Sequence, residues 1–66
     1  MIRSKAQLTK AIEKQGFKFE DAMYYPEYRN TPTLCWSVWV SCNGTEYMIE
    51  GDTVNEVYEN LLEELM

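Results

Sequence analysis

The sequence predicts a single small α+β domain, residues 1–66, with the element order α-β-β-β-α and a three-stranded antiparallel sheet that carries both helices on one face. Three observations predict it. Apolar residues recur with helical spacing at the two ends of the chain, the middle is rich in Val, Trp and Tyr, and Asn43-Gly44 divides that middle with a residue pair typical of tight β-hairpins. A chain of 66 residues is long enough for one core only, so we expect one domain.

The first helix is expected over residues 5–15. Ser4, followed three residues later by Gln7, fits a capping box that satisfies the first backbone N–H groups of a helix. Gly16 suits the position just after a helix, where the backbone turns left-handed. The apolar stripe between these ends consists of Leu8, Ala11 and Ile12.

An extended segment is expected over residues 17–25. Its alternation of apolar and polar residues slips at Glu20-Asp21, which predicts either a β-bulge there or a late start of the strand. Residues 26–32 begin and end with proline and are expected to form the longest loop, because proline cannot donate to a central strand ladder. Residues 33–42 then predict the central strand.

The hairpin turn fixes the pairing of the next two strands. If Asn43-Gly44 forms a two-residue type I′ turn, residues opposite each other have numbers that sum to 87. Val38 then faces Ile49 on the core side of the sheet, and Trp39 faces Met48 on the other side. The polar residues that we expect to be exposed around the second pair are Ser37, Ser41, Glu46 and Glu50.

The last helix is expected over residues 54–65. Thr53 and Glu56 form a second capping box, and Asp52 adds a negative charge at the positive end of the helix dipole. The apolar stripe is unbroken and consists of Val54, Val57, Tyr58, Leu61, Leu62 and Leu65. Two helices with such stripes need the same face of the sheet, so we expect the opposite face to be uncovered.

Composition argues against catalysis. The chain has no His, so the commonest general base and metal ligand are missing, and its glycines are isolated rather than grouped into a phosphate-binding loop. Cys35 and Cys42 lie seven positions apart in one expected strand, roughly 23 Å, which is too far for a disulfide. We therefore expect a non-enzyme without cofactor or metal. The N-terminus does not resemble a signal peptide and no apolar run is long, which predicts a cytoplasmic protein away from membranes.

The uncovered sheet face is the first candidate site. Trp39 and Met48 are expected to be neighbours there, rimmed by Glu46 and Glu50, with Cys35 on the same side. Tyr24 joins them if the register of the first strand allows it. An apolar pair inside a polar rim is typical of a protein-binding patch. The alternative is that loop 26–32 folds over the pair and covers it.

The acidic side of the last helix is the second candidate. Glu56, Glu59 and Glu63 form a carboxylate row at helical spacing. The row either binds a partner or only keeps the helix soluble. Residues 1–18 hold five basic residues and one acidic residue, whereas residues 19–66 hold one basic and ten acidic residues. This distribution favours a protein partner with a basic surface and disfavours direct contact with nucleic acid.

Two stretches resemble known families. The order α-β-β-β-α over the whole chain is similar to the double-stranded-RNA-binding domain, but the family's lysine cluster would fall on Val54-Asn55-Glu56, which contains no base, so its RNA binding is not expected here. The segment 51–61 resembles the strand-to-helix junction of HicB-type antitoxins. More loosely, the chain looks like small acidic phage and mobile-element proteins, many of which inhibit host proteins by binding them.

These observations lead to one functional hypothesis and two alternatives. The hypothesis is a non-catalytic, small acidic protein that binds, and inhibits or modulates, a nucleic-acid-handling protein of the kind that phages and mobile elements target. The first alternative is a HicB-like, antitoxin-type neutralising domain. The second is a structural homodimer that forms through the open sheet face.

Overall fold

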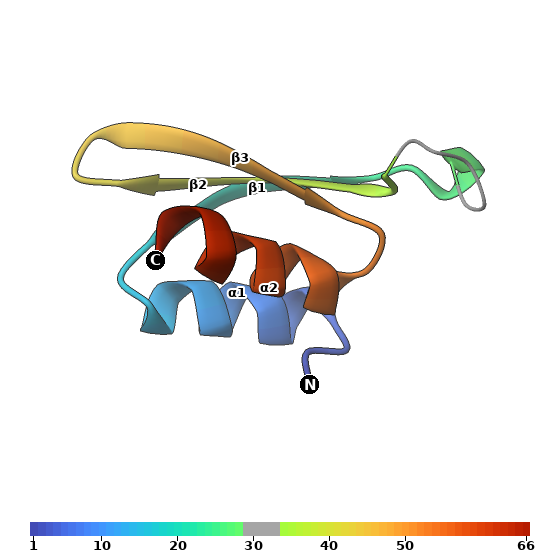
Figure 1. The fold of residues 1–66 in the computed structure, drawn as a ribbon, viewed down its shortest axis with the longest axis horizontal. Coiled ribbons are helices and arrows are strands. Elements are labelled where there is room, and N and C mark those ends of the chain that lie inside the picture. The colour runs from blue at the N-terminus through green and yellow to red at the C-terminus, as the bar shows by residue number, and fades with distance from the viewer. Residues whose placement is uncertain (29–33) are drawn as a thin grey trace.

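The computed structural model describes residues 1–28 and 34–66 and has two layers, a three-stranded antiparallel sheet and a pair of helices (Figure 1). This confirms the predicted α+β class and the order α-β-β-β-α. The elements are α1 (Lys5–Lys14), β1 (Lys18–Tyr24), the short 3₁₀ helix η1 (Pro26–Tyr28), β2 (Trp36–Cys42), β3 (Thr45–Gly51) and α2 (Val54–Leu65). No helix in the described parts of the chain is long and apolar enough to cross a membrane.

The hairpin of β2 and β3 has the predicted register. Val38 pairs with Ile49 and Trp39 pairs with Met48, so the rule that opposite residues sum to 87 is confirmed. Asn43 and Gly44 both have positive φ, 53° and 82°, as a type I′ turn requires. The central strand is β2, with β1 and β3 at the two edges.

Both helix starts use the capping residues that the sequence indicated. In α1 the Ser4 Oγ accepts from the Gln7 N–H, and in α2 the Thr53 Oγ1 accepts from the Glu56 N–H at 3.0 Å. The return bonds reach one residue further back than in the standard box. Gln7 Oε1 accepts from the Arg3 N–H and Glu56 Oε1 accepts from the Asp52 N–H.

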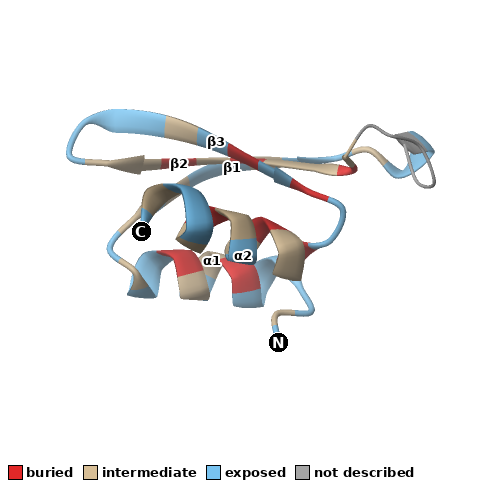
Figure 2. Ribbon diagram, viewed as in Figure 1, coloured by how far each residue is buried: buried red, intermediate tan, exposed pale blue. Residues whose placement is uncertain are grey.

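The core lies between the helix pair and one face of the sheet. Figure 1 shows α1 and α2 on the same side of the sheet, and α2 contacts β3 while α1 contacts β1. In Figure 2 the buried positions follow the facing sides of both layers. The fully buried side chains are Leu8 and Ile12 of α1, Val38 and Val40 of β2, Ile49 of β3, and Val57 and Leu61 of α2.

Some boundaries differ from those expected. α1 ends at Lys14, one residue early, and β2 begins at Trp36 rather than at residue 33. The predicted loop contains η1 at its start, and the remainder of that loop lies largely in residues 29–33, outside the described part of the chain. Between Phe19 and Asp21 the pairing of β1 with β2 shifts, so of the two alternatives the bulge is confirmed, and a late strand start is wrong because β1 already begins at Lys18.

Gly51 has a packing role that the sequence did not reveal. A Cβ added there would lie 2.7 Å from the backbone nitrogen of Val57, closer than real Cβ contacts come. Glycine at the end of β3 therefore lets the first turns of α2 lie directly against the strand.

Truncation of Leu61 to Ala tests the docking of α2. Because Leu61 is fully buried, Leu61→Ala should lower the free energy of unfolding by about 2–5 kcal/mol. Leu62→Ala is the matched control, since Leu62 is only partly buried and should cost less. Chemical denaturation followed by circular dichroism measures both. Equal midpoints for the wild type and Leu61→Ala would contradict the packing.

The substitution Gly51→Ala tests the close approach of β3 and α2. Overpacking against a backbone atom should cost about 1–3 kcal/mol and loosen the start of α2. Gly44→Ala is the control, because no atom lies within 4 Å of the added Cβ and only the positive φ opposes it, at about 1 kcal/mol. Hydrogen exchange should accelerate at the Val57 amide in Gly51→Ala and not in Gly44→Ala. Unchanged exchange in both variants would rule the clash out.

Candidate functional site

Strand alternation defines a sheet face that points away from the core. On the central strand, Val38 and Val40 are fully buried, so the residues between and beside them face the other way. We call this surface the open face. The strand pairing places on it Lys18, Asp21 and Met23 of β1, Ser37, Trp39 and Ser41 of β2, and Glu46, Met48 and Glu50 of β3.

The centre of the open face is apolar. Trp39 and Met48 are direct cross-strand partners, and Met48 is 50% exposed while Trp39 is partly buried. Met23, which is 43% exposed, pairs with Ser37 and so lies diagonally beside Trp39. Sequence reasoning missed Met23, because its face could not be assigned without knowing how the bulge shifts β1. The signal that places Met23 is its position next to Tyr24. Because Tyr24 pairs with Trp36 on the helix side of the sheet, the neighbouring Met23 lies on the open face.

The bulge in β1 gathers two consecutive carboxylates onto the open face. Asp21 pairs with Trp39, and Glu20 reaches the same side, because the Ser41 Oγ donates to Glu20 Oε2 at 2.6 Å. Strict alternation would place neighbouring residues on opposite faces. The Asp21 carboxylate is also held, since its Oδ1 accepts from the Ala22 N–H at 2.8 Å. The extra residue therefore concentrates negative charge beside Trp39.

Two hollows flank the Trp39–Met48 pair. The first, which we call the tryptophan hollow, has a volume of about 260 Å³ and is lined by Glu20, Asp21, Trp39 and Glu46. The second, the edge hollow, has a volume of about 400 Å³ and lies where β3 meets α2; it is lined by Leu34, Met48, Glu50, Asn60, Glu63 and Glu64. Each hollow thus combines an apolar surface with carboxylate walls.

The three residues of the acidic row expected on α2 have different surroundings in the structure. Glu63 lines the edge hollow with Met48, whereas Glu56 is occupied as a helix cap through its bond to the Asp52 N–H. Glu59 is exposed and lines neither hollow. Glu64, which was not part of the expected row, does line the edge hollow. The Asn60 Nδ2 holds this side of α2 against β3 by donating to the Glu50 carbonyl oxygen at 2.7 Å.

The placement of Cys35 on an exposed patch is wrong. Cys35 is only 4% exposed and lies at a bend before β2 begins, so it adds almost no area to an exposed patch. Tyr24 does not join the open face either. It pairs with Trp36, and the two rings lie with their centroids 4.8 Å apart on the side of the sheet that faces the helices.

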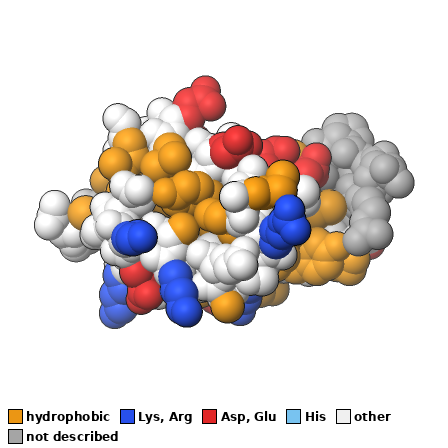
Figure 3. Space-filling model, turned by 90° about the horizontal axis from the view of Figure 1, so that it is seen from below, with side chains coloured by type: hydrophobic (Ala, Val, Ile, Leu, Met, Phe, Trp, Pro, Cys, Tyr) orange, Lys and Arg blue, Asp and Glu red, His pale blue; other side chains and the backbone are white. Residues whose placement is uncertain are grey.

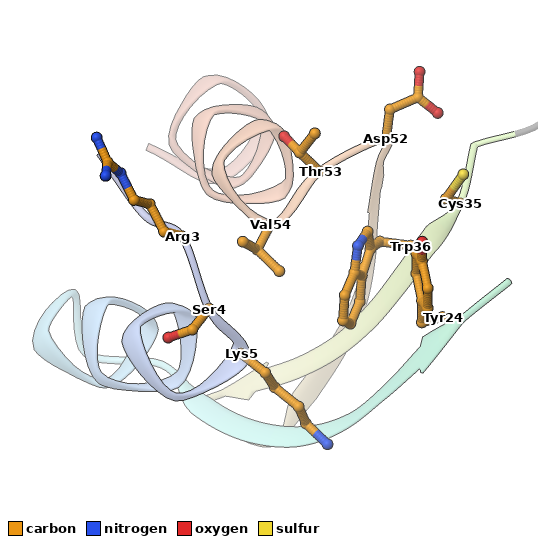
Figure 4. A pocket seen from close by; sticks show the side chains of 9 residues that line it. All are labelled: Arg3, Ser4, Lys5, Tyr24, Cys35, Trp36, Asp52, Thr53 and Val54. Atoms are coloured by element: carbon orange, nitrogen blue, oxygen red, sulfur yellow. The ribbon is translucent and has the colours of Figure 1, made fainter. Parts of the chain in front are cut away.

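A larger pocket of about 500 Å³ lies at the starts of both helices (Figure 4). Its polar groups already have local roles: the Ser4 and Thr53 side chains cap the helices, and the Lys5 Nζ lies 5.9 Å from the Phe19 ring centroid. Figure 4 shows the side chains of Arg3 and Asp52 directed away from the aromatic pair rather than converging on it. The pocket is lined by Arg3, Ser4, Lys5, Tyr24, Cys35, Trp36, Asp52, Thr53 and Val54.

Most of the positive charge lies along α1, on the far side of the sheet from the open face. Lys5, Lys10 and Lys14 are exposed along α1, and Figure 3 shows Lys and Arg side chains with hydrophobic side chains between them, while most of the Asp and Glu side chains in that view gather near its top. The open face and the edge hollow therefore face away from most of the positive charge. Within the described residues, no group of three or more Cys, Asp or Glu side chains is placed to hold a metal ion.

Comparison with protein-family models, with curated proteins and with solved structures finds no match to this chain. The geometry and charge of the open face are therefore the observations that bear on function.

Neighbouring residues of β3 test whether the open face is separate from the core. Met48→Ala should change the free energy of unfolding by less than about 1 kcal/mol, because half of Met48 is already in water. Ile49→Ala should cost about 2–5 kcal/mol, because Ile49 is 2% exposed on the other side of the same strand. Urea denaturation of the two variants provides the comparison, and similar losses would mean that Met48 is part of the core.

Proposed function

We propose that this protein is a non-catalytic binding protein whose open face docks onto a basic surface of another protein. The observation that carries the proposal is the Trp39–Met48 pair, of which Met48 is half exposed, flanked by carboxylates on both edge strands, β1 and β3. Among the described residues that the pairing places on this face, Lys18 is the single base, against Glu20, Asp21, Glu46 and Glu50. Charge complementarity therefore selects a cationic partner.

The composition of the face supports a protein partner. Protein interfaces have an apolar centre in which aromatic residues and Met are enriched, and a polar rim that stays near water. Trp39 and Met48 supply such a centre, and the carboxylates of the two hollows supply the rim. Anchors of this kind contribute most of the binding free energy, while rim charges act mainly on the association rate.

The same charges argue against two other occupants. A two-fold homodimer would place the open face against itself, so Glu46 and Glu50 of one copy would meet the equivalent acidic face of the other. Like charges opposed in this way are destabilising. Nucleic acid would bring a second dense array of negative charge to the same surface. A basic protein surface has neither difficulty.

Proteins with basic surfaces suggest the class of partner. Proteins that handle nucleic acid carry basic surfaces that neutralise phosphates, and a small acidic protein seated on one of them competes with the nucleic acid. We therefore propose that the protein inhibits or modulates a nucleic-acid-handling protein by occupying its basic surface. The loose resemblance to small acidic phage and mobile-element proteins, many of which inhibit host proteins by binding, supports a role of that kind.

The anchor variant Trp39→Ala tests the proposal. The wild-type protein, used as bait, captures candidate partners, and each is then purified and titrated by calorimetry. Trp39→Ala should weaken binding by more than about 2 kcal/mol, roughly 30-fold, without changing the helical circular dichroism. Glu46→Gln with Glu50→Gln should mainly slow association and reduce its salt dependence.

A double variant on the helix side, Lys10→Gln with Lys14→Gln, is the matched control and should bind like the wild type. Two results would count against the proposal. The first is a partner that binds Trp39→Ala as tightly as the wild type. The second is a wild-type homodimer in sedimentation that Trp39→Ala dissociates, which would show that the open face pairs with a second copy instead.

A further inference from the structure

The two hollows lie on opposite sides of the Trp39–Met48 pair. Glu46, in the tryptophan hollow, precedes Met48 by two residues on β3, and Glu50, in the edge hollow, follows it by two. The edge hollow also extends across β3 to Glu63 of α2. With about 3.3 Å per residue along a strand and about 4.8 Å between strands, the hollow centres are about 10–15 Å apart.

Each hollow has the chemistry to hold the end of a basic side chain. In the tryptophan hollow, a cation can lie over the indole of Trp39 while carboxylates from β1 and β3 accept its hydrogen bonds. In the edge hollow, Leu34 and Met48 offer apolar contact for the methylene stem, and Glu63 lies beyond them for the charged head. One bond already orders this wall, since the Asn60 Nδ2 donates to the Glu50 carbonyl oxygen.

An α-helix of the partner matches the open face better than an extended segment does. The open face is the face of a sheet, and the backbone groups of its central strand, β2, are paired with β1 and β3. An extended segment laid across it would leave its own backbone groups without partners, whereas a helix satisfies them internally. Helix residues seven or eight positions apart lie on one side about 10–12 Å apart, within the range of spacings of the two hollows.

We infer that the partner presents to the open face an α-helix with two Arg or Lys residues about two turns apart and an apolar residue between them. The inference rests on the proposed function and names the element of the partner that is bound. The two cations enter the tryptophan hollow and the edge hollow. The apolar residue packs on Trp39 and Met48 between them.

Synthetic peptides test the spacing directly. The probe is an alanine-based helical peptide with a central Leu and two Arg residues two turns apart, labelled for fluorescence anisotropy. The control peptide has the same composition with the two Arg residues one turn apart. The two-turn peptide should bind at least about tenfold more tightly, and its binding should shift the NMR amide signals of β2 and β3 rather than those of α1.

Variants of the protein assign each cation to its hollow. Glu46→Gln and Glu63→Gln should each weaken binding of the two-turn peptide about five- to tenfold, because each removes one carboxylate from a different hollow. Glu59→Gln is the matched control, since Glu59 lies on the same helix as Glu63 but lines neither hollow, and it should bind like the wild type.

The outcomes separate this inference from the proposed function. Equal affinities for the two peptides, or an equal effect of Glu59→Gln and Glu63→Gln, would show binding by net charge only and overturn the helix inference. A purified partner that still depends on Trp39 would leave the proposed function standing in that case. If that partner bound Trp39→Ala as tightly as the wild type, both the helix inference and the proposed function would be overturned.

Discussion

The Asn43-Gly44 turn is the constraint on which the rest of the structure depends. Its positive φ angles fix a two-residue hairpin, and the hairpin fixes which side of β2 and β3 each side chain takes. A slip of one residue would move Trp39 into the core and Val38 into water. This one turn thus determines both the core face and the open face of the sheet. The apolar stripes of the two helices pack on the core face.

Local signals made much of this fold predictable. The capping residues Ser4 and Thr53, the turn and the apolar stripe of the last helix each depend on residues within a few positions of one another, and the structure has all of them. The Trp39–Met48 pair at the centre of the candidate site followed from the turn in the same way.

What the sequence did not predict depends on contacts between distant segments. Glu63 and Glu64 join Met48 only because α2 packs against β3, and Gly51 is needed for the same approach. The burial of Cys35 depends on a bend that interrupts strand alternation just before β2. The alternative that loop 26–32 covers the Trp39–Met48 pair concerns mainly residues 29–33, which lie outside the described part of the chain.

The bulge in β1 has a consequence for self-assembly as well. β1 is an edge strand, and a flat edge strand is a template on which another chain can extend the sheet and begin to aggregate. The shift between Phe19 and Asp21 interrupts the regular spacing of hydrogen-bonding groups along that edge, and Glu20 and Asp21 add negative charge at the same point. The bulge that enriches the open face in carboxylates thereby also makes the β1 edge a poorer template for sheet extension, and removal of the extra residue would make that edge regular.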